Sequence, residues 1–150
     1  MRWTPRVTVA AVIENQGRFL VLEESENSAQ QGPTVINQPA GHLEDGESLL
    51  AAVIRETLEE TAWRFTPEAI TGIYRWVHPD KGHTYLRVTY TGSVSDHDPL
   101  LTLDTGILRT HWLSREELLE RSLRSPMVMR CIDDYLAGHR YALSLCDDVI

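Results

Sequence analysis

The sequence lacks a long apolar run, a secretory signal and a set of paired cysteines. No stretch approaches the ~18 consecutive apolar residues of a membrane-spanning helix, so we expect no membrane partner. The first residues enter an apolar stretch without the zones of a signal peptide, which predicts a cytoplasmic protein. Cys131 and Cys146 have neither CxxC spacing nor a catalytic signature, and we expect reduced thiols that pack as small apolar residues.

Basic residues are also scarce, because 14 Lys and Arg stand against 22 Asp and Glu, for a net charge of -8. This balance argues against a nucleic-acid duplex as partner, since such binding needs a basic face. The histidines show no HxH or HExxH spacing, so a zinc site is not expected. A phosphate-bearing ligand of this chain would therefore need metal cations.

The length of 150 residues predicts a single domain over residues 1–150, with one active site. Hydrophobic residues at 42% and charged residues at 24% are typical of a globular protein. The sequence does not distinguish a monomer from a homodimer.

The first half of the chain alternates between strand and helix patterns. Residues 7–13 are continuously apolar, and the turn residues after them lead to a second apolar run at 18–22, which predicts a hairpin. Residues 25–34 are polar and contain Gly and Pro, as in a surface loop. From Glu47 to about Thr61 apolar residues recur at three- and four-residue spacing, which predicts a helix. Candidate cap and turn residues just before this helix are Asp45 and Gly46.

The second half contains three strand patterns, at 72–77, 85–90 and 108–113. A helix start is expected at Ser114, and an amphipathic helix over 126–136. Strands on both sides of a central helix, with helices after the last strand, predict an α/β fold. Its mixed sheet would be sandwiched between helices in an α/β/α arrangement.

Three glutamates of the central helix converge on one side. On an ideal helix Glu56, Glu59 and Glu60 fall within an arc of roughly 100°. Their mutual repulsion would be reversed by a divalent cation, and Mg²⁺ prefers carboxylate oxygens together with substrate phosphates. The alternative is an ordinary solvated helix, because glutamate is a good helix former.

The spacing around these glutamates favours the metal site. Residues 41–63 read GHLEDGESLLAAVIRETLEETAW, with glycine and charged residues at Gly41, Glu47, Arg55, Glu56, Glu59 and Glu60. This stretch resembles the Nudix box, which is Gly, five residues, Glu, seven residues, Arg-Glu, an aliphatic residue, any residue, Glu-Glu, any residue, Gly and an aliphatic residue. Three positions depart from the pattern, namely Thr57, Ala62 and Trp63. Alanine adopts the left-handed helix-stop conformation less readily than glycine, so the end of the helix is left open.

The resemblance implies a Nudix fold and a divalent cofactor, Mg²⁺ or alternatively Mn²⁺. It implies that Glu56, Glu59 and Glu60 bind the metal with the carbonyl of Gly41. It also implies that Glu47 pairs with Arg55, which would aim the glutamate row. Stretches at 37–44, 76–81 and 123–126 resemble bacterial phosphatases of the family, which implies nucleoside di- and triphosphates and a hydroxymethylpyrimidine or thiamine diphosphate as substrates.

Hydrolysis also needs a base for the attacking water, and the sequence leaves several candidates. They are Glu56 and Glu59 on the helix, and the acids of the later loop, Asp96, Asp98 and Asp104. Our hypothesis is a box glutamate, because it would lie near the metal. The predicted catalytic residues are then Glu56 and Glu59, together with Arg55 and Glu47, which would orient them.

Candidate substrate contacts are spread over the chain. The predicted substrate-binding residues are Gln38, Arg75, Arg87 and Arg124. Arg124 is favoured among them. Lys81 could also neutralise phosphates, and Trp76 or Tyr85 could stack on a heterocyclic base. The alternative for each is structural, since strand arginines are often solvated and strand aromatics often lie in a core.

Three other functions are weighed against this hydrolase. The box specifies a diphosphate and not its substituents, so dinucleoside polyphosphates and nucleotide sugars are alternative substrates. A Nudix domain could also sense a nucleotide without cleaving it. A structural domain with an acidic helix would show no stabilisation by metal.

Overall fold

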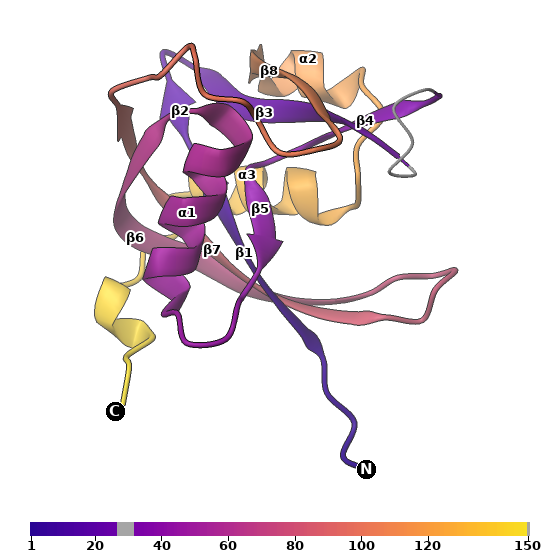
Figure 1. Ribbon diagram of the computed structural model, residues 1–150, viewed down its shortest axis with the longest axis vertical. Coiled ribbons are helices and arrows are strands. Elements are labelled where there is room, and N and C mark those ends of the chain that lie inside the picture. The colour runs from indigo at the N-terminus through magenta and orange to yellow at the C-terminus, as the bar shows by residue number, and fades with distance from the viewer. Residues whose placement is uncertain (27–31, 150) are drawn as a thin grey trace.

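The computed structural model describes residues 1–26 and 32–149, so part of the predicted loop at 25–34 lies outside the described residues. Its strands form two four-stranded sheets (Figure 1). The order in the first, mixed sheet is β5 (Ala40–His42), β1 (Arg6–Val12), β7 (Thr84–Ser95) and β6 (Arg64–Val77). Strand β1 is parallel to β7 and antiparallel to β5, and β6 is antiparallel to β7.

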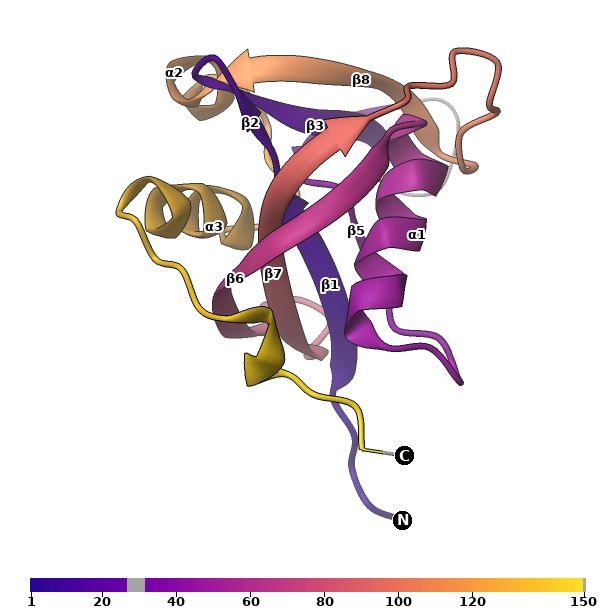
Figure 2. The same cartoon turned by 90° about the vertical axis from the view of Figure 1, so that its left-hand side faces the viewer.

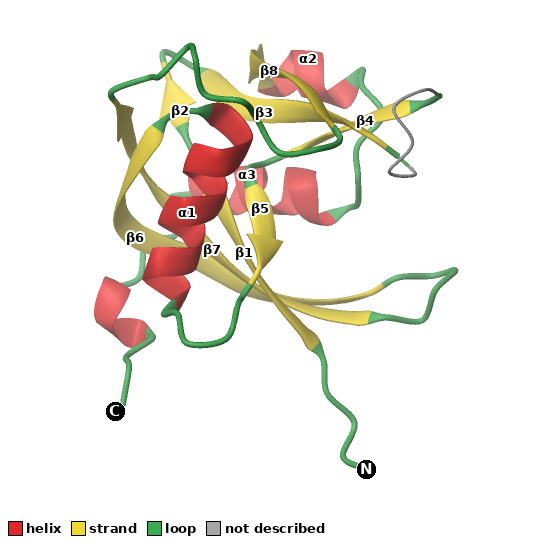
Figure 3. Ribbon diagram, viewed as in Figure 1, coloured by secondary structure: helices red, strands yellow, loops and turns green. Residues whose placement is uncertain are grey.

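The second sheet is antiparallel and is built around β3 (Figure 3). Its strands are β2 (Glu14–Asn15), β3 (Arg18–Ser25), β4 (Thr34–Asn37) and β8 (Ile107–Ser114).

Helices cover both faces of the first sheet. The helices are α1 (Leu49–Thr61), α2 (Arg115–Leu119), α3 (Met127–Leu136) and the short 3₁₀ helix η1 (Leu143–Leu145). Figure 2 shows α1 on one side of β1, β6 and β7 and α3 on the other. Among the described residues, none of these helices is long and apolar enough to cross a membrane. The predicted α/β/α arrangement is confirmed.

Strand β1 is buried on both faces, which accounts for its mostly apolar sequence. Val9 and Ala11 belong to a core with Ala52 and Val53 of α1. Val12 belongs to a second core, with residues of α3. Because successive side chains point to opposite faces, a strand between two helices buries both sets of side chains, and residues 9–12 of β1 are apolar accordingly.

The predicted hairpin is only partly correct. Glu14 pairs with Phe19 and Asn15 with Arg18, but β1 does not pair with β3. Both edges of β1 are already hydrogen-bonded, to β5 and to β7, so no edge remains for β3. The chain therefore leaves the first sheet at the turn and enters the second.

Strands β6 and β7 are longer than the predicted 72–77 and 85–90, and β6 begins directly after α1. Pro67 lies within β6, next to a register shift between Pro67 and Ala69. Because β6 is at the edge of its sheet, a residue without an N–H can be accommodated there.

The N-cap of α1 differs from the expected residues, and its C-terminal stop is one that the sequence left open. Ser48 is the N-cap, and its Oγ accepts a hydrogen bond from Ala51 N at 3.0 Å, so Asp45 and Gly46 precede the cap. At the other end Ala62 adopts the left-handed conformation, with φ 63° and ψ 17°, and donates to Leu58 O. Alanine thus takes the place of the usual glycine, at a conformational cost of about 1 kcal/mol.

Candidate metal and substrate site

Three carboxylates meet beside the C-terminal half of α1. Glu56 and Glu59 project from the helix, and Asp104 comes from the connection between β7 and β8. One oxygen of each lies within 4.8 Å of the others. Asp104 N also donates to Glu59 O at 3.1 Å, which ties the connection to the helix. We call these three residues the acid group.

The neighbouring strand β5 brings Gly41 against the acid group. A Cβ at this position would overlap the carboxylate of Glu56. A side chain at position 41 would therefore displace the Glu56 carboxylate from its place, whereas the backbone conformation of Gly41 is not an unusual one. Of the β5 carbonyls, that of His42 accepts a hydrogen bond from Arg55 Nη2 of the helix at 3.3 Å. The Gly41 carbonyl as a metal ligand stays a prediction.

Arg55 links the acid group to the loop before α1. Its Nε and Nη2 donate to the two oxygens of Glu47, at 3.0 and 2.6 Å, so the predicted ion pair is present and bidentate. Its Nη1 donates to Glu56 at 2.9 Å and to Glu59 at 3.2 Å. Arg55 thus orients two members of the acid group as well as the loop.

Even with Arg55, the acid group is short of positive charge. Burial raises the pKa of Glu56, the hydrogen bond from Arg55 opposes this, and the charges of Glu59 and Asp104 raise the pKa further. A hard divalent cation prefers carboxylate oxygens and would relieve this repulsion. The donors that the structure brings together therefore fit the divalent metal that the family generally uses.

Glu60, the third predicted ligand on the helix, stands apart from the acid group. It is 7% exposed and accepts a hydrogen bond from Ala40 N at 2.8 Å. Burial raises the pKa of Glu60 well above its usual value, the Ala40 bond opposes this, and the charge of Glu56 adds to it. Glu60 thus links β5 to α1 through a hydrogen bond, and the negative charges of the acid group act on its carboxylate.

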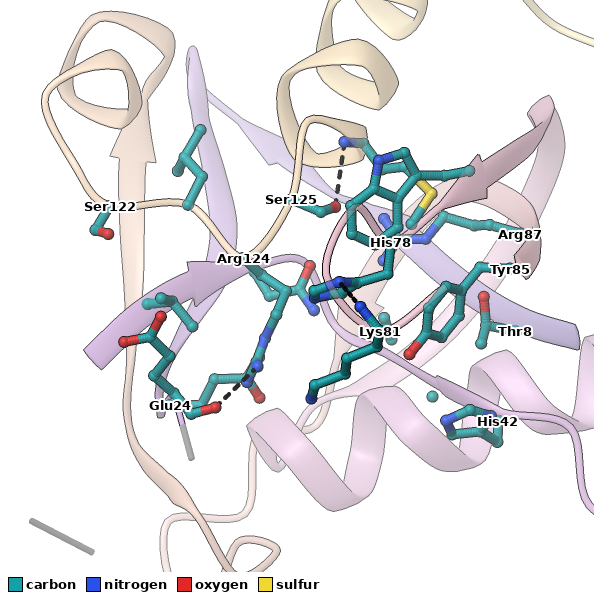
Figure 4. Close-up of a pocket in the computed structure, with 18 of the residues that line it drawn as sticks. Thr8, Glu24, His42, His78, Lys81, Tyr85, Arg87, Ser122, Arg124 and Ser125 are labelled. Carbon is teal, nitrogen blue, oxygen red and sulfur yellow. Dashed lines mark hydrogen bonds and ion pairs between the residues drawn. The ribbon is translucent and has the colours of Figure 1, made fainter. Parts of the chain in front are cut away.

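A cavity of about 510 Å³ opens beside β5 (Figure 4). Trp76 and Tyr85 stack in its wall with ring centroids 5.7 Å apart. Polar side chains from several strands and from the segment before α3 complete the lining, among them Thr8, Asn37, Lys81, Arg87, Ser122, Arg124 and Ser125. Ala40, Gly41 and His42 of β5 also line it, and Gly41 lies against the Glu56 carboxylate, so β5 stands between the cavity and the acid group.

The predicted substrate contacts separate in space. Arg87 and Arg124 line the cavity, whereas Arg75 and Gln38 do not. Arg75 is exposed and lies between Tyr74 and Trp76 on β6, so it points to the opposite face of the strand. Gln38 is buried and donates from Nε2 to Val128 O at 2.7 Å.

Arg124, the favoured candidate, is engaged by protein groups. Its Nε and Nη2 lie 3.0 and 2.9 Å from Glu24 Oε1. Among the described residues it also donates to the carbonyls of Ser25 and Glu26, both at 3.3 Å. These contacts clamp the end of β3 to the segment before α3.

Sequence reasoning named Asp104 only as a base and missed Thr8 and Asn37. Asp104 is far from the helix in sequence, and Asp96 and Asp98 of the same connection do not join the acid group. Thr8 lies within an apolar strand and Asn37 in a short one, where neither has a local signal.

Comparisons with known proteins agree with this geometry. Residues 3–131 match the family model of the NUDIX domain. The phosphatase NudJ of Escherichia coli K12 is 40% identical over 145 residues, which cover 96% of this chain and 92% of NudJ.

Solved structures give the same result. A NUDIX hydrolase from Nitrosomonas europaea superposes with a TM-score of 0.93 at 47% identity, over 97% of this chain and 98% of that one. The NUDIX domain of Shewanella oneidensis NrtR, solved in complex with ADP ribose, shares the fold, with a TM-score of 0.72 at 18% identity over 91% of this chain and 90% of that one. The chain therefore belongs to the Nudix family, as a hydrolase that acts on phosphoanhydride substrates.

Proposed function

We propose that this hydrolase uses Mg²⁺, with Mn²⁺ as an alternative, to release phosphate from nucleoside di- and triphosphates, and also from a hydroxymethylpyrimidine or thiamine diphosphate. The observation that carries the proposal is the acid group beside a cavity with a stacked aromatic pair. The acid group can bind a metal-diphosphate, and the aromatic pair can bind a heterocyclic ring. The name of the relative NudJ, a phosphatase, supports phosphate as the product.

In this proposal Glu56, Glu59 and Asp104 hold the cation, with the carbonyl of Gly41. Glu60 is a further candidate ligand, since a nearby cation would stabilise its ionised form. When bound, the cation neutralises the diphosphate oxygens and lowers the pKa of a bound water. Arg55 and Glu47 keep the carboxylates in place.

For the base we propose Glu59. The side chain of Glu59 is 40% exposed, against 13% for Glu56, so water reaches it more readily. The water oxygen attacks the terminal phosphorus, the bridging P–O bond breaks, and the water proton passes to the Glu59 carboxylate. The leaving group, a nucleoside diphosphate from a triphosphate or a monophosphate from a diphosphate, keeps the electrons of the broken bond.

The cavity supports a substrate of nucleotide size. Its volume of about 510 Å³ lies within the range of ~300–1,000 Å³ that small-molecule sites occupy. Trp76 and Tyr85 offer an aromatic surface for a base, and Lys81 lies at the same cavity. Specific base recognition is not required for this contact, because stacking tolerates every base.

The test is phosphate and pyrophosphate release from a panel of substrates, with Mg²⁺ or with EDTA. The panel contains nucleoside di- and triphosphates, thiamine diphosphate, a dinucleoside polyphosphate and a nucleotide sugar. We expect Mg²⁺-dependent phosphate release from the nucleotides and no release with Glu56→Gln. Cleavage of only the last two compounds would contradict the substrate class, and ligand binding without any turnover would favour a sensing domain.

We further propose a single domain in the cytoplasm, as a monomer or homodimer. Cell fractionation tests the cytoplasmic location, and light scattering distinguishes a monomer from a homodimer.

A further inference from the structure

Arg87 is a buried cation at the cavity without a counter-ion. Its residue exposure is 4%, and it lies on the central strand β7. In the part of the chain that the structure describes, no carboxylate lies within ion-pairing distance of its guanidinium. Buried charges in proteins are normally paired, because an isolated one loses its hydration without compensation.

The few contacts of Arg87 fix its direction without neutralising it. Nη1 donates to Gln38 Oε1 at 3.2 Å, and Cys131 Sγ lies 3.9 Å away. Gln38 in turn donates to Val128 O, which sets the amide so that its oxygen faces Arg87. Nε is buried and has no partner among the described residues. Gln38 is therefore a positioning residue for the guanidinium.

Two more polar groups without partners line the same cavity. Within residues 1–26 and 32–149, five residues bury a side-chain polar atom without a hydrogen bond, and three of them, Thr8, Asn37 and Arg87, line this cavity. Thr8 and Arg87 are register partners on neighbouring strands, so their side chains share one face of the sheet. Since native proteins pair nearly all buried polar groups, with protein atoms, ordered water or a ligand, these three side chains are the ones that a bound group in the cavity could satisfy.

We propose that Arg87, with Thr8 and Asn37, forms an anion subsite for a phosphoryl group that is not bound at the acid group. This inference rests on the proposed function. A neutral carbonyl would satisfy the donors but leave the charge of Arg87 uncompensated, whereas a phosphoryl group neutralises it and matches the fork of the guanidinium. The Thr8 hydroxyl can donate. The unpaired atom of Asn37 is the acceptor Oδ1, so in this proposal the amide turns to present Nδ2 to the phosphoryl group.

The subsite predicts a substrate preference. When the terminal phosphoryl group of a nucleoside triphosphate is cleaved at the acid group, the phosphoryl group attached to the nucleoside is free to reach Arg87. In a nucleoside diphosphate both phosphoryl groups belong to the cleaved bridge, and none remains for the subsite. The enzyme therefore favours triphosphates over diphosphates of the same nucleoside.

The kinetic test compares Arg87→Met with Arg64→Met, a matched change at an exposed position of the same sheet. We expect Arg87→Met to lower kcat/KM for the triphosphate by about 10- to 100-fold, through KM. The same variant should change kcat/KM for the diphosphate by less than about threefold, and Arg64→Met should change neither. An equal loss for both substrates, or none for either, would overturn the subsite.

A binding test separates the subsite from the proposed reaction. Inorganic phosphate in EDTA should raise the melting temperature of the wild type, because Arg87 needs no metal, and should not raise that of Arg87→Met. Gln38→Glu, which sets a carboxylate against Arg87, should also remove the phosphate effect. Without phosphate, Arg87→Met should melt no lower than wild type, since it removes an uncompensated charge.

Two results contradict the subsite even if the enzyme proves to be a hydrolase of another substrate. One is an unchanged phosphate effect in Arg87→Met. The other is a folded Arg87→Met protein that melts much lower and keeps its triphosphate preference, which would make Arg87 structural. Failure of the whole nucleotide panel with an intact, Arg87-dependent phosphate effect would instead contradict only the proposed reaction.

Discussion

Arg55 and Arg87, which we propose serve one substrate, have opposite surroundings. Arg55 contacts the carboxylates of Glu47, Glu56 and Glu59, whereas Arg87 contacts none in the described part of the chain. The acid group at α1 is thus short of positive charge, and the guanidinium of Arg87 lacks a counter-ion among the described residues. A metal-bound polyphosphate carries both missing charges. We infer that Arg55 orients carboxylates of the protein, whereas Arg87 binds an anionic group of the substrate.

The largest loss of activity is expected from a change in the acid group. Glu56→Gln removes a metal ligand and a charge that Arg55 orients, so Mg²⁺-dependent turnover should fall by more than about 100-fold. Phosphate release at saturating substrate measures it. Glu68→Gln, at an exposed glutamate of β6, is the control and should match wild type. Full activity in Glu56→Gln would remove the acidic end from the mechanism.

A smaller effect is expected for Asp104→Asn, which keeps the shape of the side chain. If Asp104 is a ligand and Glu59 the base, the variant should need about 10- to 100-fold more Mg²⁺ but keep kcat within about threefold at saturating metal. A titration of the rate against Mg²⁺ measures both quantities. Loss of kcat with unchanged Mg²⁺ dependence would identify Asp104 as the base instead.

Arg55→Lys retains the charge at the acidic end but loses the fork that binds Glu47 through two atoms. We expect about a tenfold loss of kcat, because Glu56 and Glu59 are less firmly oriented. Steady-state kinetics with a nucleoside triphosphate gives the value. A change confined to KM would show that Arg55 contacts substrate, which would erase the contrast with Arg87.

The smallest kinetic effect is expected for Arg124→Met at the cavity rim. Its donors already serve Glu24, Ser25 and Glu26, so KM should change by less than about threefold. Stability should fall by about 1 kcal/mol, because the clamp on β3 is lost. Kinetics and denaturant unfolding measure the two quantities. A large rise in KM with unchanged stability would make Arg124 a second phosphate ligand.

The sequence predicted local features of the site well. Helix α1, the close pairing of Glu47 with Arg55 and the convergence of Glu56 with Glu59 all follow from helical spacing and from one motif. The end of α1 at Thr61 was also as expected, although an alanine makes the left-handed stop. Such features depend on residues a few positions apart, which a sequence displays directly.

Features that depend on distant segments escaped prediction. Asp104 joins Glu56 and Glu59 only because the β7–β8 connection returns to α1. The hairpin was overextended because the sequence does not show that β1 has a partner on each side. Arg75 and Arg87 look alike on alternating strands, yet one is exposed and the other buried at the cavity. Strand order and the environment of a side chain are tertiary properties.

The most direct test of two separate ends is a two-dimensional titration of phosphate release against Mg²⁺ and a nucleoside triphosphate. Wild type, Asp104→Asn and Arg87→Met are compared under the same conditions. We expect Asp104→Asn to shift only the Mg²⁺ requirement and Arg87→Met to shift only the KM for substrate. If both variants shift the same constant, or if wild type releases phosphate equally well in EDTA, the division between a metal end and an anion end is wrong.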